Sequence, residues 1–166
     1  MSSKSSILKS IEKFQNQEDL EIKTTYDQTY NTLEAFKQNA TLAGAKIYET
    51  NEKSLNNFLN ELVYIYSDHF VYKCALGVAE NGALWCDNLK EDRKNLFLCN
   101  DLIITIRVNT LVNTMHDAYE KLQLEKNSDK DFGTFIAGPS KTADIEQSLV
   151  LGAHGAMGLH IVIVDD

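Results

Sequence analysis

The segment from Phe132 to Glu146 constrains the backbone more tightly than any other part of the chain. It reads Phe-Gly-Thr-Phe-Ile-Ala-Gly-Pro-Ser-Lys-Thr-Ala-Asp-Ile-Glu, and it holds Pro139, the only proline of the 166 residues. Five of the eight glycines also lie in this last part of the chain: Gly133, Gly138, Gly152, Gly155 and Gly158. Proline fixes one backbone conformation, and glycine permits conformations that other residues avoid. We therefore predict a short strand over 132–137, a sharp turn, and a helix over 142–151.

The start of this predicted helix is a candidate binding site. Ser140 or Thr142 would cap it, and Asp144 would lie in its positive first turn. Backbone N–H groups at a helix start, together with the positive charge of Lys141, favour a phosphate or carboxylate. The sequence matches neither the Walker A pattern nor Gly-x-Gly-x-x-Gly. An ordinary capped helix after a tight turn explains the same residues, and local chemistry alone favours that simpler interpretation.

Other side chains of this segment have two interpretations each. On a helix, Asp144 and Glu146 would point about 200° apart, so they do not form a carboxylate pair. Glu146 would share an apolar stripe, where an acid costs free energy unless it contacts a ligand or a lysine. His154 follows the predicted helix end, where histidine often caps exposed carbonyls; as a general acid or base it would need a partner that the sequence does not identify. His160 alternates with apolar residues, which indicates a structural role.

The charge balance restricts the class of partner. Asp and Glu outnumber Lys and Arg 24 to 16, a net charge of −8. Nucleic acids and anionic membranes bind clustered basic residues, so we expect neither as a partner. The Met-Ser-Ser-Lys-Ser-Ser start lacks the apolar stretch of a signal peptide. We expect a cytoplasmic protein without membrane insertion, and whether it forms a homo-oligomer stays open.

The cysteines and histidines do not form a recognisable metal motif. Cys74, Cys86 and Cys99 are odd in number and widely spaced, unlike a disulfide framework or the ligands of a zinc or iron–sulfur site. The four histidines contain no His-x-x-x-His pair. We predict buried, reduced thiols, no metal site and no cofactor held by the chain itself.

Helices and strands alternate along the chain. We expect helices over 2–17, 30–43, 52–62 and from 109 or 110 to 124, and strands over 46–49, 63–66, 96–99, 102–108, 132–137 and 159–164. Short connections between them indicate an α/β domain with a mostly parallel sheet flanked by helices. Gly44 should end the second helix. Asn81-Gly82 predicts a tight turn, with Glu80 solvated beside it.

Two motifs resemble a known family. Residues 138–155, Gly-Pro-Ser-Lys-Thr-Ala-Asp-Ile-Glu-Gln-Ser-Leu-Val-Leu-Gly-Ala-His-Gly, with Leu-His-Ile-Val-Ile-Val at 159–164, resemble the C-terminal signature of the lactate-utilisation protein C family, the LUD domain. Val-Ala-Glu-Asn-Gly-Ala-Leu at 78–84 looks like the family's Ala-Glu-Thr-Gly-Thr-Leu segment. The sequence departs from the family at Asn81 and Ala83, where threonines are usual, and at Ala156, where proline is usual. It is also shorter between Tyr66 and Leu76.

The resemblance implies a three-layer fold similar to the NagB/RpiA/CoA-transferase group, with residues 1–166 as one LUD-type domain and 1–25 as a helical N-terminal extension. Ligands of such folds bind at the carboxyl ends of parallel strands. It further implies an accessory role in bacterial oxidation of L-lactate to pyruvate, beside iron–sulfur partner proteins. The implied ligand-binding residues are Asn81, Gly82, Gly138, Ser140, Lys141 and Thr142, and the candidates for chemistry are Glu80, Asp144, Glu146 and His154. The alternatives are a stand-alone enzyme or binding protein for a small anion (a sugar phosphate, CoA ester or carboxylate) and a pure interaction domain.

Overall fold

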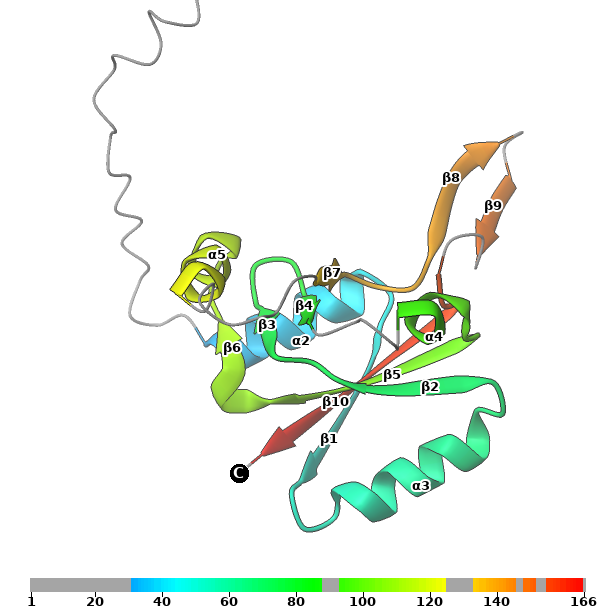
Figure 1. Cartoon of the computed structure of the whole chain (residues 1–166), viewed down its shortest axis with the longest axis horizontal. Helices are drawn as coiled ribbons and strands as arrows, with labels where there is room; N and C mark the ends of the chain where they lie inside the picture. Colours follow the sequence, from blue (N-terminus) through cyan, green and yellow to red (C-terminus); the bar gives the residue numbers. More distant parts are fainter. Residues whose placement is uncertain (1–30, 88–92, 125–132, 146–147, 152–154, 166) are drawn as a thin grey trace, which may run out of the picture. The chain divides into compact units, whose positions relative to one another are not determined.

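Four parallel strands form the central sheet, sheet A, in a computed structural model that describes residues 31–87, 93–124, 133–145, 148–151 and 155–165 (Figure 1). Their order is β1 (Lys46–Asn51), β10 (Gly158–Asp165), β5 (Asp101–Arg107) and β2 (His69–Lys73). The two middle strands are buried along nearly their whole length. Such continuous apolar strands are typical of a parallel sheet that is covered on both faces.

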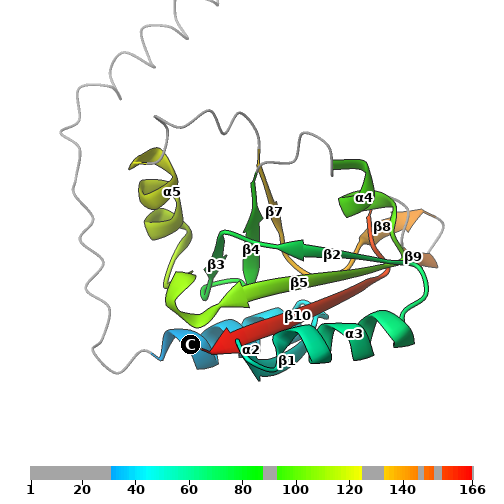
Figure 2. The same cartoon turned by 60° about the horizontal axis from the view of Figure 1, so that its bottom comes forward.

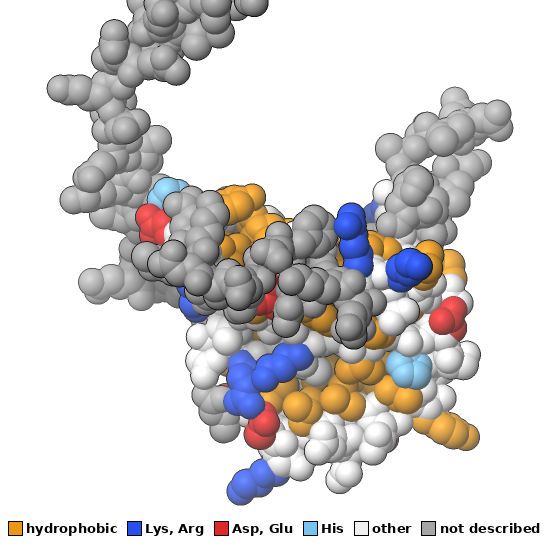
Figure 3. Space-filling view, viewed as in Figure 1, with side chains coloured by type: hydrophobic (Ala, Val, Ile, Leu, Met, Phe, Trp, Pro, Cys, Tyr) orange, Lys and Arg blue, Asp and Glu red, His pale blue; other side chains and the backbone are white. Residues whose placement is uncertain are grey.

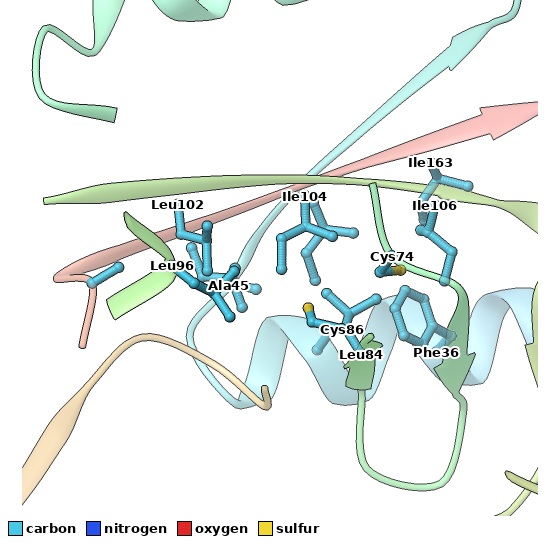
Figure 4. Close-up of a cluster of buried hydrophobic side chains, with 14 of the residues drawn as sticks. Phe36, Ala45, Cys74, Leu84, Cys86, Leu96, Leu102, Ile104, Ile106 and Ile163 are labelled. Atoms are coloured by element: carbon cyan, nitrogen blue, oxygen red, sulfur yellow. The ribbon is translucent and has the colours of Figure 1, made fainter. Parts of the chain in front are cut away.

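Alternate residues of the middle strands face opposite layers. Helix α3 (Leu55–Ile65) covers one face, where Leu62 packs against Ile103 and Val162. Helix α2 (Thr32–Leu42) lies on the other face, and its Phe36 belongs to a larger cluster with Ile104 and Ile161. Figure 4 shows Phe36 and Ile104 of this cluster between the sheet and α2. The second cluster is therefore the main core.

A second sheet, sheet B, closes this core. Its strands follow the order β6 (Leu111–Val112), β3 (Leu76–Val78), β4 (Ala83–Cys86) and β7 (Thr134–Ile136). In Figure 2 its strands run across the direction of sheet A. Leu84 and Cys86 of β4 face the main core, and Ala83 and Trp85 face helix α5 (Met115–Leu124) with Ala118.

The remaining elements are short. Helix α4 (Arg93–Leu98) adds Leu96 to the main core, and a 3-10 turn, η1 (Val108–Thr110), follows β5. Strands β8 (Lys141–Ile145) and β9 (Ser148–Leu151) pair antiparallel in a hairpin that extends past α4 (Figure 1).

The structure confirms the predicted fold class, an α/β arrangement with a mostly parallel sheet flanked by helices. The predicted strands over 46–49, 102–108 and 159–164 correspond to β1, β5 and β10, and the predicted helix over 30–43 corresponds to α2. Gly44 follows α2 with a φ of 103°, as a helix-ending glycine should. Asn81 and Gly82 turn the chain between β3 and β4, as predicted.

The helix predicted over 142–151 is wrong, since this segment forms β8 and β9. A ten-residue helix forms only when an apolar face packs against a core. Thr142, Ile145 and Val150 are β-branched, and a segment this short matches a helix and a strand about equally well. The predicted caps at Ser140 and Thr142, and the helical first turn around Asp144, are wrong with it.

Three other boundaries also differ. The strand predicted over 63–66 is wrong because α3 continues to Ile65, and the strand predicted over 96–99 is helix α4. In α3 the helical stripe continues through Leu62 and Val63 onto sheet A. The helix predicted from 109 or 110 begins only at Met115, after η1 and β6.

Part of the predicted N-terminal architecture lies outside the described residues, namely the helix over 2–17 and the extension over 1–25. The elements described above all belong to one compact unit, Asn31–Asp166. None of the helices in the described part of the chain is long and apolar enough to cross a membrane.

Candidate functional site

Strand pairing brings two of the sequence-predicted loops together. In the β4–β7 ladder Leu84 pairs with Ile136, so the turn that contains Gly82 and the turn that contains Gly138 lie at the same end of the ladder. Both glycines have positive φ, 69° and 84°. A Cβ on Gly82 would overlap the backbone of Ala40, and one on Gly138 would overlap the carbonyl of Ala43. Both loops therefore lie against α2, where only glycine fits.

Glu80 and Asn81 hold this arrangement in place. The Glu80 carboxylate accepts a hydrogen bond from the backbone N–H of Met115 (2.9 Å), at the start of α5. The Asn81 side chain accepts from the N–H of Ala83 (3.0 Å), which stabilises the turn. Asn39 of α2 donates to the carbonyls of Ala79 (2.7 Å) and Glu80 (3.2 Å). These contacts give the Glu80-Asn81 motif a structural role: one side chain caps a helix and the other closes a turn.

The residues 138–141, called here the signature turn, meet the end of a helix and not its start. The Lys141 ammonium donates to the carbonyl oxygen of Ala43 (2.8 Å), the C-cap of α2. A helix C-terminus carries partial negative charge and attracts cations. Lys141 therefore neutralises the end of α2, and the physical basis of the predicted anion site, a helix N-terminus, is missing here.

A cavity of about 240 Å³ lies beside the signature turn. Gly138, Ser140 and Lys141 line it, while the other walls are largely apolar and come from α4, β7 and the amino ends of β5 and β10: Leu96, Phe97, Leu102, Phe135, Ile136, Ala137, Pro139, Gly155, Ala156 and Leu159. The Ser140 N–H donates to the carbonyl of Ala156 (2.8 Å), which ties the turn to the start of β10. Basic side chains are exposed beside hydrophobic ones near α4 and β8 (Figure 3). The cavity suits a small ligand with an apolar part better than a fully polar one.

Two of the remaining candidates belong to the β8–β9 hairpin. The backbones of Thr142 and Asp144 lie in β8. Glu146 and His154 lie outside the described residues, so their predicted roles stay predictions. At the carboxyl ends of sheet A, where the resemblance implies ligands, Arg107 pairs with Glu52 (2.8 Å).

The opposite face of sheet A holds a line of hydrogen-bonded side chains, called here the polar chain. The Lys46 ammonium lies 3.5 Å from the Tyr66 hydroxyl, which lies 3.5 Å from the Tyr48 hydroxyl. The Tyr48 hydroxyl is 3.3 Å from Nδ1 of His160, and Nε2 of His160 is 3.0 Å from the Asp101 carboxylate. The polar chain was not predicted from the sequence. Its members come from β1, β5, β10 and the residue after α3, which are far apart in the sequence.

Burial makes the contacts of the polar chain important. His160 is fully buried, and burying a polar ring without partners would cost several kcal/mol. Burial, together with the Tyr66 hydroxyl, raises the pKa of Tyr48 to about 12, so Tyr48 stays a hydroxyl donor. A Cβ on Gly158 would overlap the Asp101 carboxylate. Glycine at 158 thus leaves the space through which Asp101 reaches His160.

The cysteines are buried, as predicted. Burial raises the pKa of the Cys74 and Cys99 thiols, and it raises that of Cys86 to about 12. Thiolates, the form that binds metals, are therefore disfavoured. Within the described ranges, no three His, Cys, Asp or Glu residues lie together as a metal-binding group.

The model of the LUD domain family matches residues 64–164. The chain belongs to the LUD domain family. The match begins at the end of α3 and includes β10, so it covers both sides of the cavity and the Tyr66, Asp101 and His160 part of the polar chain.

Curated relatives share part of their length with this LUD-domain chain. It is 33% identical over 89 residues to the uncharacterized protein NMB1437 of Neisseria meningitidis serogroup B. This alignment covers 53% of this chain and 38% of that protein. It is 26% identical over 110 residues to lactate utilization protein C of Oceanobacillus iheyensis, which covers 64% of this chain and 47% of that protein. The chain thus spans less than half the length of these curated relatives.

A solved structure has the same fold. The crystal structure of a DUF162 family protein from Deinococcus radiodurans aligns with a TM-score of 0.65 at 15% identity, and the alignment covers 80% of this chain and 96% of that one. At this identity the likeness shows the fold alone.

Proposed function

We propose that this LUD-domain protein is an accessory component of bacterial L-lactate oxidation to pyruvate, in which iron–sulfur partner proteins carry the electrons. The observation that carries the proposal is the match to lactate utilization protein C from several bacteria, including Deinococcus radiodurans at 28% identity over 100 residues and Bacillus pumilus at 33% over 93. These matches lie within the LUD domain family to which the chain belongs.

The burial of the thiols supports placing the iron–sulfur clusters in the partner proteins and not in this chain. An iron–sulfur cluster needs several cysteine thiolates at one place. The buried Cys74 and Cys86 have raised pKa values and lie within the apolar core (Figure 4). The proposal therefore assigns the clusters to the partners and a binding or scaffolding role to this chain, working in the cytoplasm.

Growth and co-purification test the proposal together. Deletion of the gene should abolish growth on L-lactate and leave growth on pyruvate unchanged, because only the oxidation step is lost. The tagged chain, purified without oxygen, should retain iron–sulfur proteins that are visible in the absorption spectrum and in an iron assay. Normal growth of the deletion strain on lactate, with no iron in the purified fraction, would rule the proposal out.

We propose as a second candidate function the binding of a small anionic ligand, a sugar phosphate, a CoA ester or a carboxylate. The largely apolar walls of the cavity favour a CoA ester or a carboxylate with an apolar part over a sugar phosphate. The cavity's volume of about 240 Å³ is below the range of about 300–1,000 Å³ typical of drug-sized ligand sites, which favours a small molecule or one end of a larger one. A thermal-shift screen with lactate, pyruvate, sugar phosphates and CoA esters tests it. A ligand of the cavity should lose its effect in Gly155→Val, which adds a side chain to the cavity wall. A shift that survives this substitution would place the ligand elsewhere.

A further inference from the structure

The polar chain has a definite direction of hydrogen bonding. A carboxylate oxygen only accepts, so Nε2 of His160 carries the proton that bonds to Asp101. In a neutral imidazole Nδ1 is then an acceptor, and the Tyr48 hydroxyl donates to it. The Tyr48 oxygen can accept from Tyr66, and the Tyr66 oxygen accepts from Lys46. Each hydrogen bond of the polar chain is therefore donated in the direction of Asp101.

The bonds of this chain are tight at its buried end and loose at its surface end. The His160–Asp101 distance is 3.0 Å, whereas Lys46–Tyr66 and Tyr66–Tyr48 are both 3.5 Å. Hydrogen bonds between hydroxyl groups are typically about 2.7–2.8 Å long. In enzymes without bound substrate, catalytic hydrogen bonds are often long and shorten when the substrate binds. Three donor groups, one of them an exposed ammonium, therefore converge with incomplete bonding.

We propose that Lys46, Tyr66 and Tyr48 bind a small oxyanion, and that His160 takes up one proton when the anion binds. An oxyanion accepts hydrogen bonds from all three groups and shortens the loose contacts. Tyr48 has one proton, so donating it to the anion requires Nδ1 of His160 to become a donor. The proton comes from solvent and converts His160 into an imidazolium between Asp101 and Tyr48. The added proton cancels the charge of a monoanion such as acetate and half of the charge of a dianion such as sulfate.

His160 is surrounded by polar groups from several elements. The titratable and charged groups that face it, or face its partners, come from β5, β1, β2 and the residues after α3: Asp101, Lys46, Tyr48, His69, Tyr66 and Asp68. Asp101 supplies the counter-charge at 3.0 Å, while Lys46 opposes a second positive charge until an anion binds beside it. His69 is held by the Tyr66 carbonyl (2.6 Å), and the Asp68 carbonyl accepts from the Asp101 N–H (3.0 Å). The buried face of α3 adds only apolar side chains here.

This site is separate from the cavity at the signature turn and does not rest on the proposed role in lactate oxidation. Leu102 and Leu159, which line the cavity, point to the main core. His160 alternates with Leu159 along β10, so it lies on the α3 face. The ligand chemistry is an oxyanion group, either a planar carboxylate or a tetrahedral sulfate or phosphate.

Calorimetry on the full chain tests the proposal with sodium acetate and sodium sulfate, whose charges stay constant between pH 6 and 8. Titrations in two buffers of different ionisation enthalpy give the number of protons taken up. We expect uptake approaching one proton per anion at pH 8, and an affinity that falls by up to about tenfold per pH unit as the pH rises. The tighter of the two anions identifies the planar or the tetrahedral geometry.

Single substitutions distinguish the side chains that bind the anion from those that couple binding to proton uptake. Lys46→Met should weaken binding at least about tenfold, the scale of one lost charge-assisted hydrogen bond. Tyr48→Phe should retain weak binding and lose the proton uptake. Tyr64→Phe is the matched control, because Tyr64 lies on α3 with 92% exposure, and it should change neither.

Three results would overturn the proposal: no heat from either anion beyond that of sodium chloride at equal ionic strength, binding without proton uptake, or unchanged binding in Lys46→Met. The first would mean that water alone fills the gap. The number of protons taken up is measured on the unmodified protein. It therefore tests the proposal even if a variant fails to fold.

Discussion

The signature turn and the polar chain lie at the same end of sheet A, on opposite faces, and use their polar groups differently. In the signature turn Lys141 is bonded to the end of α2 and the cavity beside it is largely apolar. In the polar chain five polar side chains converge, and its surface contacts are long. A recognisable sequence motif thus stabilises a tight backbone, while side chains from distant strands form the buried hydrogen-bonded line that ends at Asp101.

A test of the first half of this comparison is Gly138→Ala. The residue has a positive φ, and a Cβ would overlap the carbonyl of Ala43. We expect the free energy of unfolding to fall by about 3 kcal/mol, from backbone strain plus overpacking. Urea denaturation measures it. Gly155→Ala is the control, because its nearest neighbour would be 3.4 Å away, and it should cost about 0.5 kcal/mol or less. Equal losses in the two variants would contradict the packing of the turn on α2.

The second test removes the space that the polar chain needs. Gly158→Ala should displace Asp101 from His160 and cost about 1–2 kcal/mol, since a buried imidazole N–H loses its acceptor. In a double-mutant cycle with Asp101→Ala the two losses should not add, because both substitutions break the same contact. Additive losses would mean that Gly158 acts on something else.

The third test distinguishes whether Lys141 stabilises the C-terminus of α2 or binds a ligand. Lys141→Met should lower the free energy of unfolding by about 0.5–1 kcal/mol, because α2 loses the cation at its C-terminus. Binding of acetate and sulfate to the polar chain should be unchanged. Lys73→Met, at the exposed end of β2, is the charge-matched control and should cost less. A loss of anion binding in Lys141→Met alone would return the anion site to the signature turn.

The smallest effect is expected at alkaline pH. The pKa of Tyr48 is raised to about 12 in the folded state, so folded Tyr48 holds its proton where unfolded Tyr48 loses it. That contribution to stability is complete below the usual tyrosine pKa near 10 and is lost as the pH rises toward 12. Urea midpoints from pH 9 to 11.5 should therefore fall more steeply for the unmodified chain than for Tyr48→Phe. Parallel curves would mean that Tyr48 is not buried as described.

The fold was predictable where one residue type or one pattern decides the conformation. The apolar run in β5, the turn at Asn81 and the end of α2 at Gly44 have one physical solution each. The signature turn was predicted as a turn, but the segment after it was predicted as a helix and is a hairpin. Nothing within residues 142–151 decides between the two, because the choice depends on which other elements the segment packs against.

The candidate site was predictable only in part. The motif residues Gly82 and Gly138 both lie against α2, beside Ala40 and Ala43. The polar chain depends on parallel pairing of β1, β10 and β5, which pairs His160 with Lys46 and pairs Asp101 with Gly158, two residues before His160. Those strands are far apart in the sequence, and Tyr66 was predicted to lie in a strand, so spacing alone could not bring these side chains together.

The protonation of His160 tests the central claim most directly, namely that the polar chain binds an oxyanion and takes up a proton with it. A long-range proton–nitrogen NMR spectrum at pH 8, assigned with His160→Gln, reports both ring nitrogens. We predict a proton on Nε2 alone in the anion-free protein, and protons on both nitrogens when acetate or sulfate is bound. A proton on Nδ1 alone, or a ring unchanged by saturating amounts of both anions, would contradict the account.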